Sequence, residues 1–410
     1  MNVLFMHQNF PGQFQHLAAA LAAQPGNNVV FLTQRKDRRI PGVRKIVYKT
    51  SRDASKETHR YLQSFESATI RGQGVARALL QLAREGFRPD VICGHCGWGE
   101  TMFVKDIFPD VPLINYFEFY YHSSGADAGF DPEFPTSLDS AAALRVRNSV
   151  QLLGLEACDV GLSPTRWQQS LYPQAFQDKI RVIHEGVDTQ RVKPADDAVF
   201  EMADGRRLTA EDEVVTYVSR NLEPYRGFHM LMRALPELLR RRPRAQVVLV
   251  GDDGRGYGSV PADGTSWRET LLREVSIDAS RVHFVGRLPY DKYLKLLQVS
   301  SAHVYFTYPF VLSWSALEAM AAGCALIASD TAPVREVVRD GWNGLLVDFF
   351  DRQGLVDRIE RVLAHPDGMA AMRRRARKDV VERFDLRKVC LPAQLRLLDE
   401  VTSRHAVAAG

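Results

Sequence analysis

Two arginines that follow one apolar strand are the first residues whose type and spacing fit a chemical task. The strand is VVTYVS, residues 214–219, and we expect Arg220 and Arg226 in the loop after it. Two guanidinium groups at such a strand end can bind a diphosphate bidentately. Surface arginines near Glu223 are the alternative that the residues alone leave open.

A second candidate site surrounds the start of an alanine-rich helix predicted over residues 315–322, which follows a short strand at 303–307. Ser315 and Glu318 have the S-x-x-E spacing of a capping box, and Gly323 ends the helix. Free backbone N–H groups at a helix start bind phosphates and other anions. This segment is therefore either an anion site or an ordinary capped connection between two strands.

In the first half of the chain, titratable side chains follow two apolar strands. The run PDVICGH ends at His95, and a strand predicted over residues 112–122 carries Glu118 and His122 among aromatic residues. Ligands bind at the carboxyl ends of strands in open α/β sheets. These groups suit a wall that faces a sugar, and solvated polar residues at a strand end are the alternative.

Glycines and cysteines suggest other ligands more weakly. Gly12 follows the first strand and precedes a helix, as in a phosphate-binding turn or an ordinary tight turn. The run GDDGRGYG invites a dinucleotide interpretation, but Pro261 and a further glycine stand where the phosphate-binding helix should begin. Cys93 and Cys96 have C-x-x-C spacing without a second ligand pair, so no metal site is predicted.

The elements that position these residues alternate between strand and helix along the whole chain. The alternation pauses after the run KIRVIHEGVD, residues 179–188, and a hairpin signal at Asp204 and Gly205 precedes its return at residue 214. A chain of 410 residues exceeds what one hydrophobic core usually serves. We therefore predict an α/β protein of two domains.

Composition excludes several classes of protein. A net charge of +4 is too small to imply nucleic acid, and five cysteines at irregular spacing fit a reducing cytoplasm. The start lacks the basic region of a signal peptide, and we find no apolar run of bilayer length. The expected location is the cytoplasm.

A basic segment at residues 35–56 qualifies the expected cytoplasmic location. It is either a solvated loop or a contact with an anionic phospholipid or lipid-linked acceptor on the inner membrane face, to which Ile40, Val43, Ile46 and Val47 could add apolar contact. A second basic run, MRRRARK at residues 372–378, is expected to be a solvated helix face. The basic residues of the first segment are Arg35, Lys36, Arg38, Arg39, Arg44, Lys45, Lys49, Arg52 and Lys56.

The order of motifs in the second half resembles the retaining glycosyltransferases of family 4. The resemblance implies a GT-B fold, in which two Rossmann-like domains face a central cleft. It places an acceptor-binding domain at 1–190, a nucleotide-sugar-binding domain at 191–385, and a helix at 386–410 that crosses back to the first domain. The matching runs are SRNLEPYRG (219–227), VVLVGD (247–252), VHFVGRLP (282–289), ALEAMAAGCALIASD (316–330) and VREVVRDGWNGLLV (334–347).

The resemblance also implies roles for single residues. Arg220 and Arg226 would contact the donor diphosphate, Glu318 the ribose, and His95 and Glu118 the sugar from the other domain, without metal or cofactor. The remaining donor-binding positions would be Gly12, Arg287 and Leu288 near the base, and the loop of Phe310, Val311, Leu312 and Ser313.

Three positions depart from the family pattern. Phe310 stands where the family has a glutamate, Arg226 where a lysine is common, and Glu118 where a histidine is frequent. The expected activity is transfer of a sugar from a UDP- or GDP-linked donor to a glycan, glycolipid or small molecule, with retention. A catalytically inactive scaffold of the same fold and a nucleotide-sugar epimerase are the alternatives.

Overall fold

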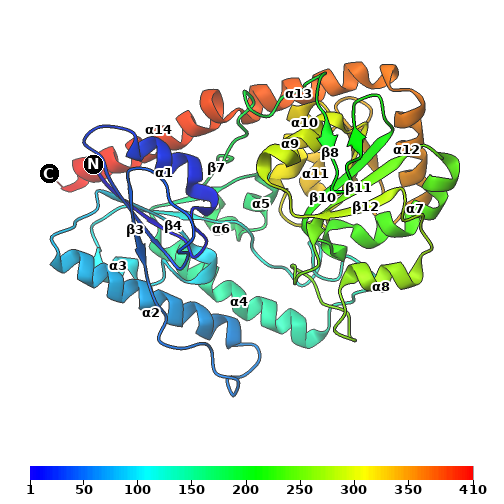
Figure 1. Cartoon of the computed structure of the whole chain (residues 1–410). Coiled ribbons are helices and arrows are strands. Elements are labelled where there is room, and N and C mark those ends of the chain that lie inside the picture. The colour runs from blue at the N-terminus through cyan, green and yellow to red at the C-terminus, as the bar shows by residue number, and fades with distance from the viewer. Residues whose placement is uncertain (410) are drawn as a thin grey trace. The chain divides into compact units, whose positions relative to one another are not determined.

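The computed structural model describes the backbone of residues 1–409 and the side chains of residues 1–405. The chain forms two compact units (Figure 1). Unit 1 contains residues 1–186 together with the C-terminal segment from residue 387 on, and unit 2 contains Val187–Leu386. The final segment therefore belongs to the same compact unit as the N-terminus.

Unit 1 is built on a parallel sheet of seven strands in the order β3-β2-β1-β4-β5-β6-β7. The strand order reverses between β1 and β4, and ligands bind at such switch points in open α/β sheets. The strands are β1 (Asn2–Met6), β2 (Asn28–Thr33), β3 (Val43–Val47), β4 (Val91–His95), β5 (Leu113–Tyr116), β6 (Val160–Ser163) and β7 (Ile180–Val182).

Helices cover both faces of this sheet (Figure 1). Because successive side chains of a strand point to opposite faces, Val3 and Phe5 pack with α1 and α14, whereas Leu4 and Met6 pack with α2. The sheet is therefore buried on both sides, as parallel sheets generally are. The helices of unit 1 are α1 (Gln15–Ala22), α2 (Gln63–Arg84), α3 (Val104–Ile107), α4 (Leu138–Ala157), α5 (Arg166–Ser170), α6 (Gln174–Gln177) and α14 (Leu391–Ala409).

Unit 2 repeats this plan with a parallel sheet of six strands in the order β12-β11-β10-β13-β14-β15. A two-stranded antiparallel hairpin, β8 (Phe200–Glu201) and β9 (Arg207–Leu208), precedes it, as the Asp-Gly signal predicts. The sheet reverses order between β10 and β13. Its strands are β10 (Val214–Asn221), β11 (Gln246–Asp252), β12 (Val282–Gly286), β13 (Ala302–Tyr305), β14 (Ala325–Ser329) and β15 (Leu345–Val347).

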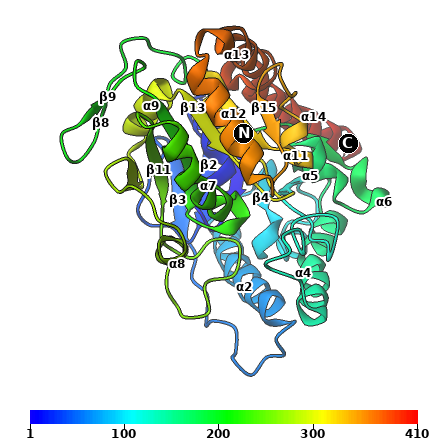
Figure 2. The ribbon, with the colours of Figure 1, turned by 90° about the vertical axis from the view of Figure 1, so that its right-hand side faces the viewer.

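The helices of unit 2 also form two layers. Helices α7 and α12 lie side by side on one face of the sheet (Figure 2), and α10 packs against α9 and α13. The helices are α7 (Phe228–Arg241), α8 (Trp267–Glu274), α9 (Tyr290–Val299), α10 (Trp314–Ala322), α11 (Ala332–Arg335), α12 (Arg352–Ala364) and α13 (Ala370–Phe384).

The two places where the chain changes units are tied together within unit 2. The Val187 N–H donates to Phe384 O at 2.8 Å, and the Leu386 N–H donates to Val187 O at 2.8 Å. The Thr189 hydroxyl donates to the Asp385 carboxylate. These bonds hold the first residues of unit 2 against its last residues.

Several predicted elements differ from the structure. The strand expected over residues 112–122 ends at Tyr116. Arg220 was expected in a loop, but β10 continues through Asn221 because Asn221 pairs with Asp252 of β11.

The two basic runs also differ in part from expectation. Ile40, Val43 and Ile46 pack against the cores of unit 1 and are partly buried there, so only part of each side chain faces outward. In the run MRRRARK, the Arg377 guanidinium donates to the carbonyl oxygens of Thr189, Val192 and Ala321 at 2.6–3.1 Å. A purely solvated helix face is therefore wrong for α13. Within the described residues, every helix is too short or too polar to cross a membrane.

Candidate functional site

In unit 1, polar side chains gather where β1, β4 and β5 end. His7 follows β1 directly, His95 is the last residue of β4, and Glu118 lies two residues after β5. Gln13 joins them from the turn η1 (Gly12–Phe14), which links β1 to α1. Since β1 and β4 flank the switch point of the sheet, this cluster occupies the position where α/β sheets bind ligands.

Hydrogen bonds connect the four side chains. His95 Nε2 lies 3.3 Å from Glu118 Oε2, and Gln13 Nε2 donates to Glu118 Oε1 at 3.2 Å. His7 Nε2 lies 2.8 Å from Gln13 Oε1, and the His7 and His95 ring centres are 4.6 Å apart. His95 and Glu118, both expected where strands end, therefore lie side by side, and His7 and Gln13 complete a cluster that the sequence did not reveal.

Burial controls the protonation state of His7 in this cluster. His7 is only 3% exposed, and burial lowers its pKa well below the ordinary value. Neighbouring His95 lowers the pKa of His7 further, whereas the hydrogen bond with Gln13 opposes the change. His7 is consequently a neutral imidazole at neutral pH.

Gly12 is required by the His7 ring. Its φ of +53° lies in the left-handed region, and a Cβ at this position would stand 2.5 Å from His7 Cδ2. A side chain here would displace the imidazole from Gln13. The structure thus explains the glycine by close packing within unit 1, and its expected contact with a donor remains a prediction.

In unit 2, the two arginines have different surroundings. Arg226 is buried in the turn η3 (Pro224–Arg226), and its Nη1 donates to Thr307 Oγ1 at 2.8 Å and to Val311 O at 3.0 Å. Arg220 is exposed near the end of β10. Arg226 is therefore partly a structural residue, whereas Arg220 presents its charge to solvent.

Both arginines lower the pKa of one buried carboxylate, that of Glu223. Glu223 Oε2 accepts the backbone N–H groups of Tyr257 at 2.7 Å and Gly258 at 3.0 Å. Burial raises the pKa of Glu223, while these bonds and the charges of Arg226 and Arg220 lower it. The glycine-rich run after β11 thus closes around a side chain of its own unit.

The start of α10 differs from the expected capping box. The N-cap is Ser313, whose Oγ accepts the Ser315 N–H, so Glu318 is not the capping partner of Ser315. The Glu318 carboxylate instead accepts hydrogen bonds from the hydroxyls of Tyr290 at 2.6 Å and Tyr293 at 2.8 Å. Burial raises the pKa of Glu318, and the two tyrosine bonds oppose that shift.

The loop before α10 is largely turned inward. Phe310, Val311 and Leu312 are each less than a tenth exposed, and the Phe310 ring contacts the rings of Tyr225 and Tyr257. The Phe310 N–H donates to Tyr308 O at 2.6 Å, and the Ser313 N–H donates to the Tyr305 hydroxyl at 2.7 Å. These two N–H groups of the expected sugar-binding loop are thus bonded within unit 2.

Arg287, Leu288 and the two cysteines of the C-x-x-C run have plain surroundings. Arg287 Nε pairs with Asp252 Oδ2 at 2.6 Å, and Leu288 packs against the core of unit 2. Burial raises the pKa of the Cys93 thiol to about 12 and that of Cys96 well above its usual value. Thiols so resistant to ionisation are poor metal ligands and nucleophiles.

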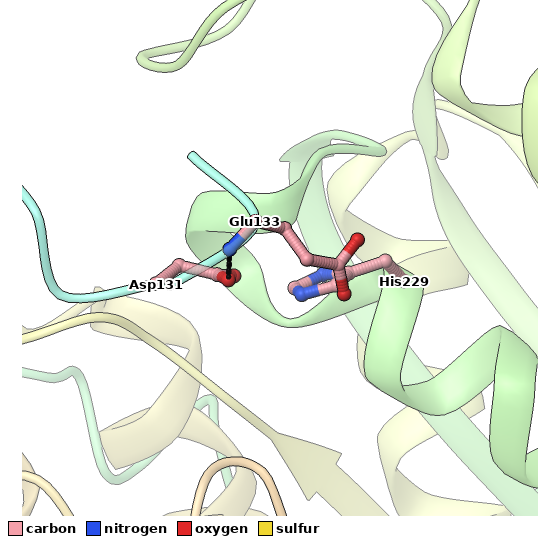
Figure 3. Close-up of side chains that lie close together, drawn as sticks. All are labelled: Asp131, Glu133 and His229. Carbon is pink, nitrogen blue, oxygen red and sulfur yellow. Dashed lines mark hydrogen bonds between the residues drawn. The ribbon is translucent and has the colours of Figure 1, made fainter. Parts of the chain in front are cut away.

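The long loop after β5 contains a tight turn at Asp131. Asp131 is buried, and its Oδ1 accepts the Glu133 N–H at 2.9 Å (Figure 3). His229, also drawn there, lies in the first turn of α7 in unit 2. The bond that Asp131 accepts from Glu133 closes a turn in a part of the loop that forms neither helix nor strand.

Family models match successive parts of the chain. A model described as Glycosyl transferase family 4 group matches residues 25–192, and one described as Glycosyl transferases group 1 matches residues 201–379. The chain belongs to the family 4, group 1 glycosyltransferases. The resemblance seen in the sequence is confirmed.

Relatives of this glycosyltransferase chain have varied names. D-inositol 3-phosphate glycosyltransferase of Nocardia farcinica is 30% identical over 203 residues, which cover 49% of this chain and 44% of the relative. Glycogen synthase of Mycobacterium tuberculosis is 26% identical over 402 residues, covering 91% of this chain and 87% of the relative. The match thus spans less than half of the first relative and most of the second.

Solved structures establish the fold of this family member. Sucrose-phosphate synthase from Thermosynechococcus elongatus gives a TM-score of 0.71 at 20% identity, with all of both chains covered. HepE of Anabaena in complex with UDP-glucose gives a TM-score of 0.65 at 18% identity, covering 100% of this chain and 99% of that one. The fold is GT-B, as the sequence predicted.

Proposed function

We propose that this chain transfers a sugar from a UDP- or GDP-linked donor to a hydroxyl group of a glycan, glycolipid or small molecule, with retention. Membership of the glycosyltransferase family is the observation that carries the proposal. The relatives named for such activities include a GDP-mannose-dependent mannosyltransferase of Mycolicibacterium smegmatis, 30% identical over 244 residues, 55% of this chain and 58% of that protein.

In this proposal unit 2 binds the donor. Arg220, exposed beside the switch point of the sheet, binds the diphosphate and stabilises the charge that develops on the leaving nucleotide. Arg226 supports that site from a buried position, and Glu318 with its two tyrosines accepts the ribose hydroxyls. Fixed guanidinium groups supply the electrostatic stabilisation, so the proposed transfer needs no metal or cofactor.

Unit 1 binds the acceptor in the same proposal. His95 and Glu118 stand at the switch point of its sheet and offer a carboxylate that accepts hydrogen bonds. Aromatic residues such as Tyr116, whose ring stacks on His95 with centres 5.4 Å apart, supply the flat surface that sugars favour. The cluster therefore suits a hydroxyl-bearing ligand.

A panel of nucleotide sugars tests the donor site. We expect a UDP- or GDP-sugar to raise the midpoint of thermal unfolding, because a ligand that binds only the folded state stabilises it. Arg220→Ala should remove that rise without changing the unliganded midpoint. The matched control is Arg207→Ala, an exposed arginine of the β8–β9 hairpin. An unchanged ligand response in Arg220→Ala would contradict the diphosphate role.

We also propose peripheral membrane contact through the basic segment at residues 35–56. Lys36, Arg38 and Arg39 are exposed and form no ion pair within the described part of the chain. The wild-type protein should co-float with anionic vesicles, whereas the double variant with Arg38→Glu and Arg39→Glu should not. The control is Lys292→Glu with Lys295→Glu, an equal charge reversal on α9. Flotation unaffected by the first pair would exclude this contact.

A further inference from the structure

The buried imidazole of His7 has a fixed tautomer. Its Nδ1 accepts the Asn9 backbone N–H at 3.0 Å, so the ring proton of the neutral imidazole is on Nε2. That Nε2–H group then donates to Gln13 Oε1 at 2.8 Å. His7 is therefore a neutral donor with one defined direction.

The orientation of the Gln13 amide follows from that donor. With Oε1 bonded to His7, the amide nitrogen is left to face the carboxylate and donates to Glu118 Oε1 at 3.2 Å. A flipped amide would place its nitrogen against the His7 proton and its oxygen against a carboxylate, which are two repulsive contacts. His7 thus determines which end of Gln13 meets Glu118.

His95 directs an N–H group at the other oxygen of the Glu118 carboxylate. Its Nδ1 accepts the Gly97 N–H at 3.2 Å, so its Nε2–H faces Glu118 Oε2 at 3.3 Å. Each oxygen of Glu118 thereby meets one donor from its own unit. Two backbone N–H groups, two rings and one amide thus act together on the orientation of a single carboxylate.

We propose that His7 is a positioning residue, which acts through Gln13 to hold the Glu118 carboxylate as a hydrogen-bond acceptor for the hydroxyl groups of a neutral sugar acceptor. The inference rests on the proposed function in naming the ligand class. Carboxylate oxygens accept and do not donate, so the ligand group that meets Glu118 is a donor, and an anionic group is repelled. Because His7 is neutral, it adds no charge that would attract a phosphate.

The two hydrogen bonds that link His7 through Gln13 to Glu118 are called the relay below. An NMR experiment tests the relay without any substrate. Long-range proton–nitrogen spectra of the full chain should show His7 as the neutral Nε2–H tautomer at pH 7. The carboxyl carbon of Glu118 should titrate roughly half to one pH unit higher in His7→Phe and in Gln13→Leu, because Gln13→Leu removes a donor to the ionised form and His7→Phe leaves the Gln13 amide free to turn that donor away. If His7 and Gln13 act as one relay, the double variant should shift no further than either single variant.

The control variant is His59→Phe, because exposed His59 also accepts an N–H at Nδ1, from Tyr61 at 3.3 Å, yet has no link to Glu118. It should leave the Glu118 titration unchanged. Additive shifts in the double variant, an Nδ1–H tautomer of His7, or an unmoved titration in Gln13→Leu would each overturn the relay. Gln13→Leu keeps His7 in place, so the test survives if His7→Phe fails to fold.

A kinetic experiment tests the ligand class. With UDP-glucose and GDP-mannose as donor probes and D-glucose or glucose 6-phosphate as acceptor probes, we expect transfer to the neutral sugar only. Both relay variants should lower that rate about tenfold with donor KM unchanged. Preference for the phosphorylated sugar would overturn the ligand class. If neither donor is turned over, the proposed function lacks support, whereas the NMR result still decides whether His7 positions Glu118.

Discussion

Replacement of Arg226 by alanine should weaken unit 2 as well as any donor site. Arg226 is 8% exposed, and its guanidinium donates through Nη1 to Thr307 Oγ1 at 2.8 Å and to Val311 O at 3.0 Å. It also lies over the rings of Tyr257 and Phe310, at 5.6 and 5.8 Å from their centres. Alanine removes all four contacts at once.

The size of the effect follows from the two short hydrogen bonds. Each bond to a charged group contributes about 1.5 kcal/mol, so Arg226→Ala should lower the free energy of unfolding by about 3 kcal/mol. For a unit of about 200 residues, that corresponds to a fall of roughly 6–12 °C in the unfolding midpoint. Arg226→Lys, which keeps one charged donor but loses the planar fork, should fall between wild type and alanine.

Differential scanning calorimetry measures this change, with Arg220→Ala as the matched control. Arg220 is exposed, so its replacement should change the midpoint by less than about 2 °C. Both alanine variants should lose the response to a nucleotide sugar. An Arg226→Ala midpoint that equals that of Arg220→Ala would refute the structural role of the buried guanidinium.

Three further changes have defined outcomes. Gly12→Ala should lower the unfolding midpoint in a thermal-shift assay, because the new Cβ strikes the His7 ring at 2.5 Å and φ is +53°. Tyr293→Phe should lower the free energy of unfolding by about 1 kcal/mol in urea, through loss of its 2.8 Å bond to Glu318. Burial lowers the pKa of His303 to about 3. Since the unfolded chain takes up that proton below about pH 6.5, urea unfolding at pH 5 should show a free energy lower by about 2 kcal/mol than at pH 7, and His303→Leu should remove this part of the difference.

The strands were predictable because their apolar runs are short and clearly interrupted. The runs at residues 3–6, 91–95 and 247–252 all form buried strands. The end of β10 was not predictable, because its extension through Asn221 depends on pairing with Asp252 of β11, a residue remote in sequence. Local pattern thus located the sheet but not the environment of Arg220.

The candidate sites were predictable only in part. His95 and Glu118 follow apolar runs, so their position at the sheet edge could be inferred from the order of the chain. His7 belongs to no motif, and its contact with the cluster depends on the turn that brings Gln13 to it. Its position directly after β1 was the one signal in the sequence. Glu318 has capping-box spacing, yet the helix begins one residue before Ser315.

The C-terminal segment of unit 1 has a consequence for synthesis of the chain. Leu397, Leu398 and Val401 of α14 share a core with Phe14 and Leu17 near the N-terminus. All residues of unit 2 leave the ribosome before α14 does, so the second unit can complete its core first. The N-terminal residues must wait, with one face of their sheet incompletely covered, until α14 itself has been made.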